Sequence, residues 1–349
     1  MLVLGIESSC DDMAAAVVKD GKHILSSVVS SQDDIHKKYG GIVPELASRR
    51  HIETVVPVVD EALEQAGIKL AEINGIGITQ GPGLVGSLLI GLSFTKAFAY
   101  VYDIPFVGVN HIVAHPLAVF LNGRGGPASK TAVKPHTPLP IPSFPLIALV
   151  VSGGHTTLFK FDTFVNYTLL GQTRDDAAGE AFDKVAKLMG FSYPGGAVVD
   201  RLAKDGDPSA INFKRPYISK DSLDFSFSGI KTAVLNHIKG IGDELSEEEI
   251  NNISASFQEA VVDVLVKKAF LACRISGVNN LILAGGVACN SRLRERAIER
   301  GKSTGVKVFI PPPSLCSDNG AVIAAAGYHL IKTGKRGDIS IDADPNLEY

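Results

Sequence analysis

Two histidines four residues apart are the side chains best suited to bind a metal. His111 and His115 lie in one half of the chain, and Asp318 begins an Asp-Asn-Gly turn much further along. Side chains at positions i and i+4 share one face of a helix, so two imidazoles can converge on one ion. A carboxylate from a remote segment would complete a three-ligand site with open coordination positions. The pattern therefore predicts a metal centre formed by His111, His115 and Asp318.

Two other interpretations compete for these residues. A zincin metalloprotease requires a glutamate directly after the first histidine to activate water, and Ile112 occupies that position. Asp318 could instead be the N-cap of a helix that begins near Gly320. The sequence therefore excludes a zincin metalloprotease, but it does not decide whether Asp318 is a metal ligand or a helix N-cap.

Two glycine turns that follow predicted strands have the composition of anion or nucleotide sites. In Ser152-Gly153-Gly154-His155 the glycines let backbone amides approach an anion closely, and the serine hydroxyl adds a donor. The segment Ala284–Asn290 lies between a strand and a helix and suits a base or ribose, with Asn290 supplying amide hydrogen bonds. The alternative for the first turn is a simple hairpin.

Carboxylates lie beside two further turns. Asp183 and Asp200 flank Tyr193-Pro-Gly-Gly196 and could hold ribose hydroxyls, although acids on a helix surface would look the same. In the N-terminal turn, Asp11 or Asp12 could orient an acceptor amine or act as a general base.

Composition limits the partners and the compartment. The 349 residues suffice for two domains, with 45% hydrophobic residues and a net charge of -3. Tryptophan is absent, and the mild acidity gives no overall attraction for phosphate polymers, so a nucleic acid would need a limited surface or helper proteins. The four cysteines form no CxxC pair, which favours reduced thiols in the cytoplasm. We expect no export signal, and we expect the apolar stretch 83–102, which Lys96 interrupts, to be an internal helix rather than a membrane span.

A repeated strand-turn-strand pattern predicts a duplicated α/β fold. Strands are expected at 2–6 and 13–18, and again at 146–151 and 156–161. Further strands are expected at 73–79, 106–109, 280–284 and 306–310, and helices at 44–66, 253–275, 291–299 and 321–330. The predicted division is a first lobe of residues 1–115 completed by 318–349, a Pro/Gly-rich loop or insertion at 116–145, and a second lobe at 146–317.

Taken in order, ten motifs of this chain resemble those of one family. It is the family of threonylcarbamoyl transferases that make N6-threonylcarbamoyladenosine in tRNA, and the start of the chain is similar to its bacterial branch. The matching segments are Gly5–Asp12, Gly41–Arg49, Gly81–Leu84, Asn110–His115, Val151–His155, Asp176–Lys184, Tyr193–Gly196, Phe225–Lys231, Gly285–Asn290 and Cys316–Gly320.

The resemblance implies a fold and a set of site residues. The fold would be the duplicated one of actin, sugar kinases and the Hsp70 ATPase, with two lobes around a cleft. One Fe²⁺ ion, or Zn²⁺, would be bound by His111, His115 and Asp318. Threonylcarbamoyl-AMP would contact Val150, Val151, Ser152, Gly153, Gly154, Asp183, Gly196, Asp200 and Asn290. Many relatives have a glutamate within the histidine motif, where this chain has Val113 and Ala114.

The implied reaction transfers the threonylcarbamoyl group from threonylcarbamoyl-AMP to N6 of the adenosine immediately 3′ of the anticodon and releases AMP. The tRNAs would be those that read codons beginning with adenine, and the partners a non-catalytic paralogue subunit and a small ATPase. A kinase or ATPase of the same fold should instead have acidic Mg²⁺ ligands. A non-catalytic scaffold should have lost the histidine pair and Asp318, and all three are present.

Overall fold

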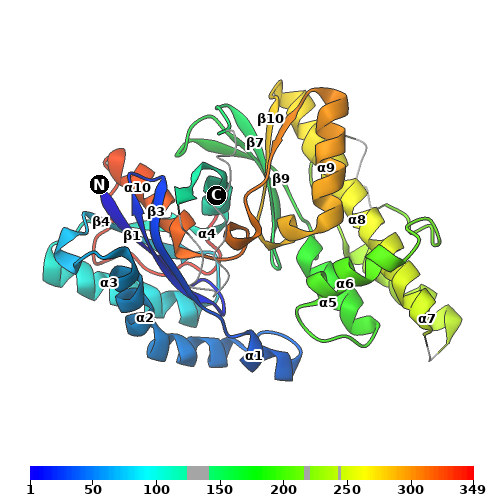
Figure 1. The fold of residues 1–349 in the computed structure, drawn as a ribbon, viewed down its shortest axis with the longest axis horizontal. Coiled ribbons are helices and arrows are strands. Elements are labelled where there is room, and N and C mark those ends of the chain that lie inside the picture. Colours follow the sequence, from blue (N-terminus) through cyan, green and yellow to red (C-terminus); the bar gives the residue numbers. More distant parts are fainter. Residues whose placement is uncertain (124–140, 216–220, 243–244) are drawn as a thin grey trace. The chain divides into compact units, whose positions relative to one another are not determined.

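The computed structural model describes residues 1–123, 141–215, 221–242 and 245–349. The chain forms two compact units (Figure 1). Unit 1 comprises Met1–Pro142, Phe164–Asn166 and Pro311–Tyr349, and unit 2 comprises Ser143–Thr163 and Tyr167–Ile310.

Unit 1 is built on a six-stranded mixed sheet in the order β5-β4-β1-β2-β3-β6. Strand β1 pairs antiparallel with β2, which pairs antiparallel with β3, whereas β1, β4 and β5 run parallel. The central strands are nearly continuous apolar runs because helices cover both faces of the sheet. The strands are β1 Leu2–Glu7, β2 Met13–Lys19, β3 His23–Ser30, β4 Gly75–Gly81, β5 Phe106–Asn110 and β6 Asn122–Gly123.

Helices α2 (Pro44–Ala66) and α3 (Val85–Tyr102) cover one face of this sheet, and α10 (Gly320–Lys332) covers the other. The alternation of side chains along β1 divides the core accordingly. Leu4 and Ile6 pack in the cluster that includes α2, whereas Val3 packs in the cluster that includes α10. The short helices are α1 (Asp33–His36) and α4 (His111–Ala114).

Helix α10 lies against the sheet backbone itself. A Cβ atom on Gly5 of β1 would overlap the carbonyl oxygen of Gly320, and one on Gly327 would lie 2.8 Å from the Cα atom of Gly77. Alanines fill most of the remaining positions of the buried helix face. Only small residues permit this approach, which fixes the start of α10 beside β1.

Unit 2 repeats the topology of unit 1. Its five strands have the order β11-β10-β7-β8-β9, which matches β5-β4-β1-β2-β3 strand for strand. The pairing senses also match, since β7-β8-β9 are antiparallel and β7, β10 and β11 are parallel. The strands are β7 Leu146–Val151, β8 Thr156–Phe161, β9 Tyr167–Gln172, β10 Asn280–Ala284 and β11 Lys307–Phe309. The predicted duplicated α/β fold is confirmed.

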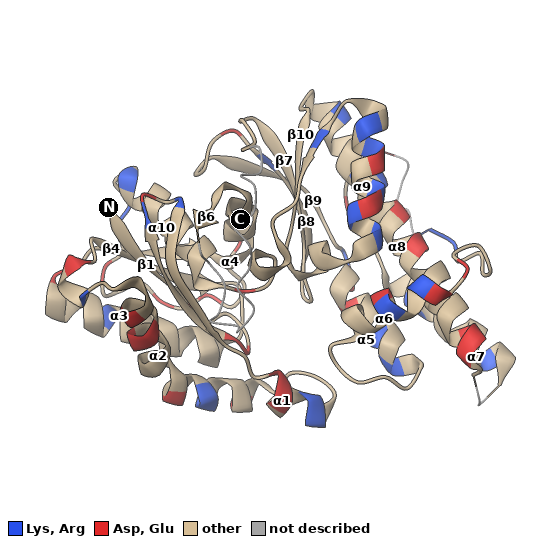
Figure 2. Ribbon diagram, viewed as in Figure 1, with Lys and Arg blue, Asp and Glu red and all other residues tan. Residues whose placement is uncertain are grey.

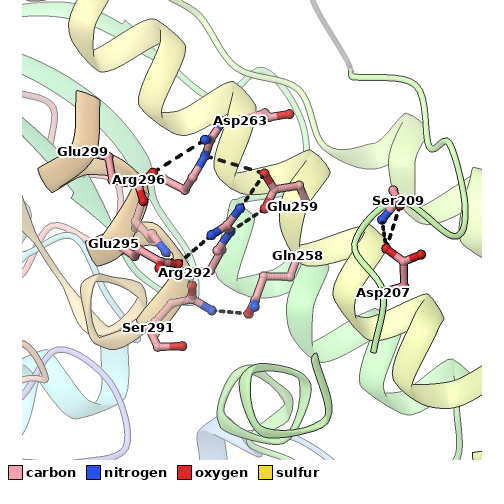
Figure 3. A network of polar contacts seen from close by, with 12 residues as sticks. Asp207, Ser209, Gln258, Glu259, Asp263, Ser291, Arg292, Glu295, Arg296 and Glu299 are labelled. Atoms are coloured by element: carbon pink, nitrogen blue, oxygen red, sulfur yellow. Dashed lines mark hydrogen bonds and ion pairs between the residues drawn. The ribbon is translucent and has the colours of Figure 1, made fainter. Parts of the chain in front are cut away.

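The helices of unit 2 are α5 (Ala178–Leu188), α6 (Gly195–Leu202), α7 (Ser228–Ile241), α8 (Glu247–Ser276) and α9 (Ser291–Thr304). Acidic and basic residues are interspersed along α9 (Figure 2). Figure 3 shows how these charges join α9 to α8. Arg292 binds Glu259 (2.6 Å) and Glu295 (2.6 Å), and Arg296 binds Asp263 (3.2 Å). These partly exposed pairs fix the register of the two helices more than they stabilise them.

The structure corrects several predicted boundaries; helix α9, for example, ends at Thr304 rather than at 299. Helix α8 begins at Glu247 rather than at 253, because Ser246 and Glu249 form a capping box. The loop predicted at 116–145 starts too early, since His115–Phe120 form a buried 3-10 helix; residues 124–140 lie outside the described residues. The second unit ends at Ile310 rather than at residue 317.

Helix α3 is long and apolar enough to cross a membrane by length and composition. It packs against α2 and β4 through a buried face that includes Leu88, Gly91 and Leu92. The predicted internal helix therefore agrees with its contacts. Its outer face leaves Val85 and Leu89 exposed, and the neighbouring α2 exposes Ile52 and Val56.

Buried His51 on α2 predicts that acid destabilises unit 1. Gln32 Nε2 donates to His51 Nδ1 (2.9 Å), and burial lowers the pKa of His51 to about 4 against the opposing charges of Glu7 and Asp11. The ring stays neutral in the folded unit but binds a proton near pH 6.5 once unfolded. The contribution of neutral His51 to the free energy of unfolding is therefore fully present above about pH 6.5. It is lost as the pH falls towards 4, and this loss amounts to up to about 3 kcal/mol.

Urea unfolding of the parent and of His51→Gln, at about pH 7.5 and about pH 5, tests this expectation. The variant should be less stable near neutral pH but should lose less free energy of unfolding on acidification. His23→Gln, at an exposed position on β3, is the control and should follow the parent. Equal losses in the parent and in His51→Gln would show that His51 does not cause the effect.

Candidate metal centre and substrate residues

The two histidines are held on one face by a capped helix. Asn110, at the end of β5, accepts hydrogen bonds from the backbone N–H groups of Ile112 (3.0 Å) and Val113 (3.1 Å) and so begins α4. The 3-10 helix that starts at His115 continues the same turn, with Pro116 at its start. Both histidine side chains are buried.

Asp318 is free to bind a ligand because its neighbour caps the helix. The side-chain oxygen of Asn319 accepts from the backbone N–H groups of Ala321 (3.1 Å) and Val322 (3.1 Å) at the start of α10. The alternative interpretation of Asp318 as the N-cap is therefore wrong. Its carboxylate, with 27% of the side chain exposed, points to the histidines instead.

The three side chains converge at the spacing that one ion requires. The Nε2 atoms of His111 and His115 are 3.3 Å apart, and Asp318 Oδ1 lies 3.6 Å from the first and 3.5 Å from the second. A point equidistant from these atoms is about 2.0 Å from each, which is a normal metal–ligand distance. Across the described parts of the chain, no other group of three His, Cys, Asp or Glu residues is gathered in this way.

A second carboxylate lies behind His111. Glu7 Oε2 is 2.8 Å from His111 Nδ1. Burial alone would raise the pKa of Glu7, but the charge and hydrogen bond of His111 and the hydrogen bonds from Ser9 lower it to about 2. The pKa of His111 is raised to about 9, because Glu7 and Asp318 outweigh the effect of burial. Burial, together with Glu7 and Asp11, raises the pKa of Asp318 to about 6 against the opposing effect of His111.

The predicted catalytic residues lie in the turn that follows Glu7. Asp11 is buried, and Asp12 is partly buried with its Oδ1 atom lacking a hydrogen-bond partner among the described residues. Burial and the charges of Asp11 and Asp318 raise the pKa of Asp12 to about 7. Burial and the same two carboxylates also raise the pKa of Cys10, so this thiol is not a ready nucleophile. With this pKa, Asp12 is suited to exchange a proton near neutral pH.

In unit 2, the segment Val150–Gly154 is both a strand end and a hairpin turn. The side chains of Val150 and Val151 are buried in the core. Ser152 N–H donates to the carbonyl of His155 (2.8 Å), and His155 N–H donates to Ser152 Oγ (3.2 Å). Within the described residues, no atom lies within 4 Å of a Cβ placed on Gly153 or Gly154. The turn therefore has the geometry of a simple hairpin, as the alternative interpretation predicted. The backbone of its two glycines is accessible to an approaching group.

The two predicted substrate aspartates accept hydrogen bonds from neighbouring segments of the chain. Asp183 accepts from Gly195 N–H (2.7 Å), and burial raises the pKa of this carboxyl despite that hydrogen bond. Asp200 accepts from the backbone N–H (3.1 Å) and hydroxyl (2.8 Å) of Ser291.

Asn290 also has partners for its side-chain amide. Its oxygen accepts from Leu293 N–H (2.9 Å) and so caps α9, and its NH2 group donates to Gln258 Oε1 (2.6 Å). Around Gly196 and Gly286, by contrast, a Cβ would meet no atom of the described chain closer than 4.0 Å. Asp183 lies on α5, Gly196 and Asp200 lie on α6, and Asn290 precedes α9. Helix α6 contacts α5 and α8, and α8 contacts α9. Among these predicted substrate residues the side chains already have hydrogen-bond partners, whereas the glycine leaves its backbone accessible.

Sequence reasoning did not single out Glu7 or Gln258. Glu7 had a detectable signal, because it is the one charged residue in an otherwise apolar strand. Gln258 lies in the middle of α8 and had none.

Comparison with known proteins identifies the family of this chain. The family model described as tRNA N6-adenosine threonylcarbamoyltransferase matches residues 23–325. A protein of that name from Syntrophus aciditrophicus (strain SB) is 52% identical, with 98% of this chain and 96% of the relative covered. Another from Geobacter sp. (strain M21) is also 52% identical and covers 99% of this chain and 96% of the relative.

Solved structures show the fold alone. Component A of (R)-2-hydroxyglutaryl-CoA dehydratase from Acidaminococcus fermentans has a TM-score of 0.50 at 17% identity, covering 96% of this chain and 100% of that one. Full-length HypF in the phosphate- and nucleotide-bound form has a TM-score of 0.58 at 14% identity, covering 95% of this chain and 46% of that one. The fold is the duplicated one shared by actin, sugar kinases and Hsp70. With half of its residues identical to those of curated relatives over nearly the whole length, the chain belongs to the tRNA N6-adenosine threonylcarbamoyltransferase family.

Proposed function

We propose that this chain transfers the threonylcarbamoyl group from threonylcarbamoyl-AMP to N6 of the adenosine immediately 3′ of the anticodon, in tRNAs that read codons beginning with adenine. The names of the curated relatives support the reaction class and the tRNA acceptor. The observation that carries the proposal for this chain is the convergence of His111, His115 and Asp318. A kinase or ATPase of this fold would need carboxylate ligands for Mg²⁺ instead of two imidazoles.

In this reaction the adenine amine attacks the carbonyl carbon of a mixed carbamic-phosphoric anhydride. A new C–N bond forms, the bond between the carbonyl carbon and the phosphate oxygen breaks, the amine loses a proton, and AMP leaves. Asp12, whose pKa is raised to about 7, is the group we propose to accept that proton.

The substrate would bind to unit 2. We assign the adenylate to Val150–Gly154, Asp183, Gly196, Asp200 and Asn290. The exposed glycine backbone offers amide donors to an anionic group. The Asp200 oxygen that does not accept from Ser291 is suited to a ribose hydroxyl.

The donor set fits an iron or zinc ion. His111, His115 and Asp318 would hold Fe²⁺, with Zn²⁺ as the alternative, because imidazole and carboxylate suit both metals. When bound, such an ion would polarise the carbonyl or stabilise the phosphate of the substrate.

For the partners, we propose a non-catalytic paralogue subunit and a small ATPase, with the complex in the cytoplasm. Support for a protein partner comes from the exposed apolar side chains of Ile52 and Val56 on α2 and of Val85 and Leu89 on α3. The two helices pack side by side on unit 1, so these side chains form one patch of the kind that protein interfaces bury.

Removal of both imidazoles tests the metal centre. The double variant His111→Ala/His115→Ala should contain no stoichiometric metal and should lose transfer activity by at least about a thousand-fold. Metal content by mass spectrometry and modified nucleoside in digested tRNA are the two measurements, with threonylcarbamoyl-AMP supplied and the partners present. His23→Ala, on the exposed part of β3, should match the parent in both. Full activity in the double variant would end the proposed role of the metal.

Asp12→Asn keeps the shape of the side chain but cannot accept a proton. We expect the transfer rate to fall by about a hundred-fold or more. In the parent, the rate should fall on acidification below about pH 7, because protonated Asp12 is inactive as a base; a bound cation would move this midpoint lower. Asp34→Asn, at an exposed position on α1, is the matched control. A parental rate and pH profile in Asp12→Asn would assign the base elsewhere.

The patch on α2 and α3 predicts the binding surface for the paralogue. The double variant Val56→Glu/Leu89→Glu should no longer copurify with that subunit, while its metal content stays unchanged. Ile298→Glu, an exposed apolar position on α9 of unit 2, should still copurify. Retention of the paralogue by Val56→Glu/Leu89→Glu would move the interface to another surface.

A further inference from the structure

Glu7 is a fully buried carboxylate at the end of a central strand. All other residues of β1 are apolar or glycine. A buried charge is costly unless it is paired and hydrogen-bonded, so its partners reveal what the residue is for.

Both oxygens of Glu7 are occupied. Oε1 accepts from the backbone N–H of Ser9 (2.5 Å), and Oε2 accepts from Thr79 Oγ1 (2.8 Å) on β4. The remaining contact of Oε2 is with His111 Nδ1 (2.8 Å). The first two hydrogen bonds hold the carboxylate in one position against the sheet. The third fixes the orientation of the His111 ring relative to that carboxylate.

The contact with His111 determines which ring nitrogen can bind a metal. A carboxylate only accepts hydrogen bonds, so Nδ1 of His111 must carry the proton in that pair. The opposite nitrogen, Nε2, is the atom that lies 3.3 Å from His115 Nε2 and 3.6 Å from Asp318 Oδ1. The lone pair of the neutral ring therefore faces the other two ligands.

We propose that Glu7 is a positioning residue of the metal centre, which orients His111, selects its Nδ1–H tautomer and supplies a second negative charge. This inference rests on the proposed metal site. Glu7 and Asp318 together carry two negative charges and the neutral imidazoles none, so a divalent cation leaves the buried group neutral. Carboxylates hydrogen-bonded to ligating histidines have this effect in other metal sites.

The competing explanation is that Glu7 only fixes the Ser8–Asp12 turn and Thr79. Glu7→Gln removes the negative charge and leaves one acceptor oxygen in place of two, so it cannot accept from Ser9 on one side and from Thr79 and His111 on the other. Thr79→Val separates the two explanations, because it removes a hydrogen bond that fixes Glu7 but leaves the charge and the contact with His111 in place.

The experiment measures Zn²⁺ affinity of the full-length chain by competition with a chromophoric chelator. We expect the dissociation constant of Glu7→Gln to rise about 10- to 100-fold. Thr79→Val, which removes one hydrogen bond to Glu7 without touching His111, should change it much less. Circular dichroism should show that both variants remain folded.

The ¹⁵N NMR signals of the His111 ring provide a test that needs no altered protein. In the zinc-bound parent, Nδ1 should carry the proton and Nε2 the metal. Coordination through Nδ1, or equal Zn²⁺ affinity of the parent and a folded Glu7→Gln, would overturn the role of Glu7 alone. A parent that binds no zinc or iron would instead overturn the metal centre of the proposed function.

Discussion

The candidate metal centre depends on the direct packing of α10 against the backbone of β1. Gly5 and Gly320 leave no room for a Cβ between strand and helix, so the start of α10 is fixed relative to the end of β1. Asp318 precedes that helix start, and Glu7 ends that strand. The histidine helix follows β5, which is linked to β1 through β4 in the same sheet. One sheet and one covering helix thus bring together four side chains from three distant segments.

This packing concentrates negative charge in a small volume. Glu7, Asp11, Asp12 and Asp318 all act on one another or on His111, and the raised pKa values of Asp12, about 7, and Asp318, about 6, reflect burial together with their mutual repulsion. A bound cation would relieve both effects, because it favours the charged form of each carboxylate. The cluster is therefore costly for the folded chain by itself, and carboxylates with pKa values raised in this way are typical of functional sites.

The sequence predicted most of the elements, and the candidate ligands that the structure brings together, because both follow local rules. Alternation and 3.6-residue periodicity located the strands and helices, and the i, i+4 spacing located the histidines. Two features could not be read in this way. One such feature is the N-cap of α10. Aspartate and asparagine are both good N-caps, so only the backbone geometry decides that Asn319, and not Asp318, accepts from the first N–H groups of the helix. The contact between Glu7 and His111 joins residues that are adjacent only through sheet pairing. The boundary near residue 116 was missed because proline and glycine there indicated a loop, whereas Pro116 begins a buried 3-10 helix.

The duplication explains why the two units carry complementary chemistry. Strand β1 of unit 1 and strand β7 of unit 2 hold the same position in matching sheets, and each is followed by a turn into its antiparallel neighbour. In unit 1 that turn follows Glu7 and contains Asp11 and Asp12, whose carboxylates suit a cation. In unit 2 it is Ser152-Gly153-Gly154-His155, whose open backbone amides and hydroxyl suit an anion. The two turns are equivalent in topology, so the different chemistry of the two units comes from the residues of the turns and not from the fold.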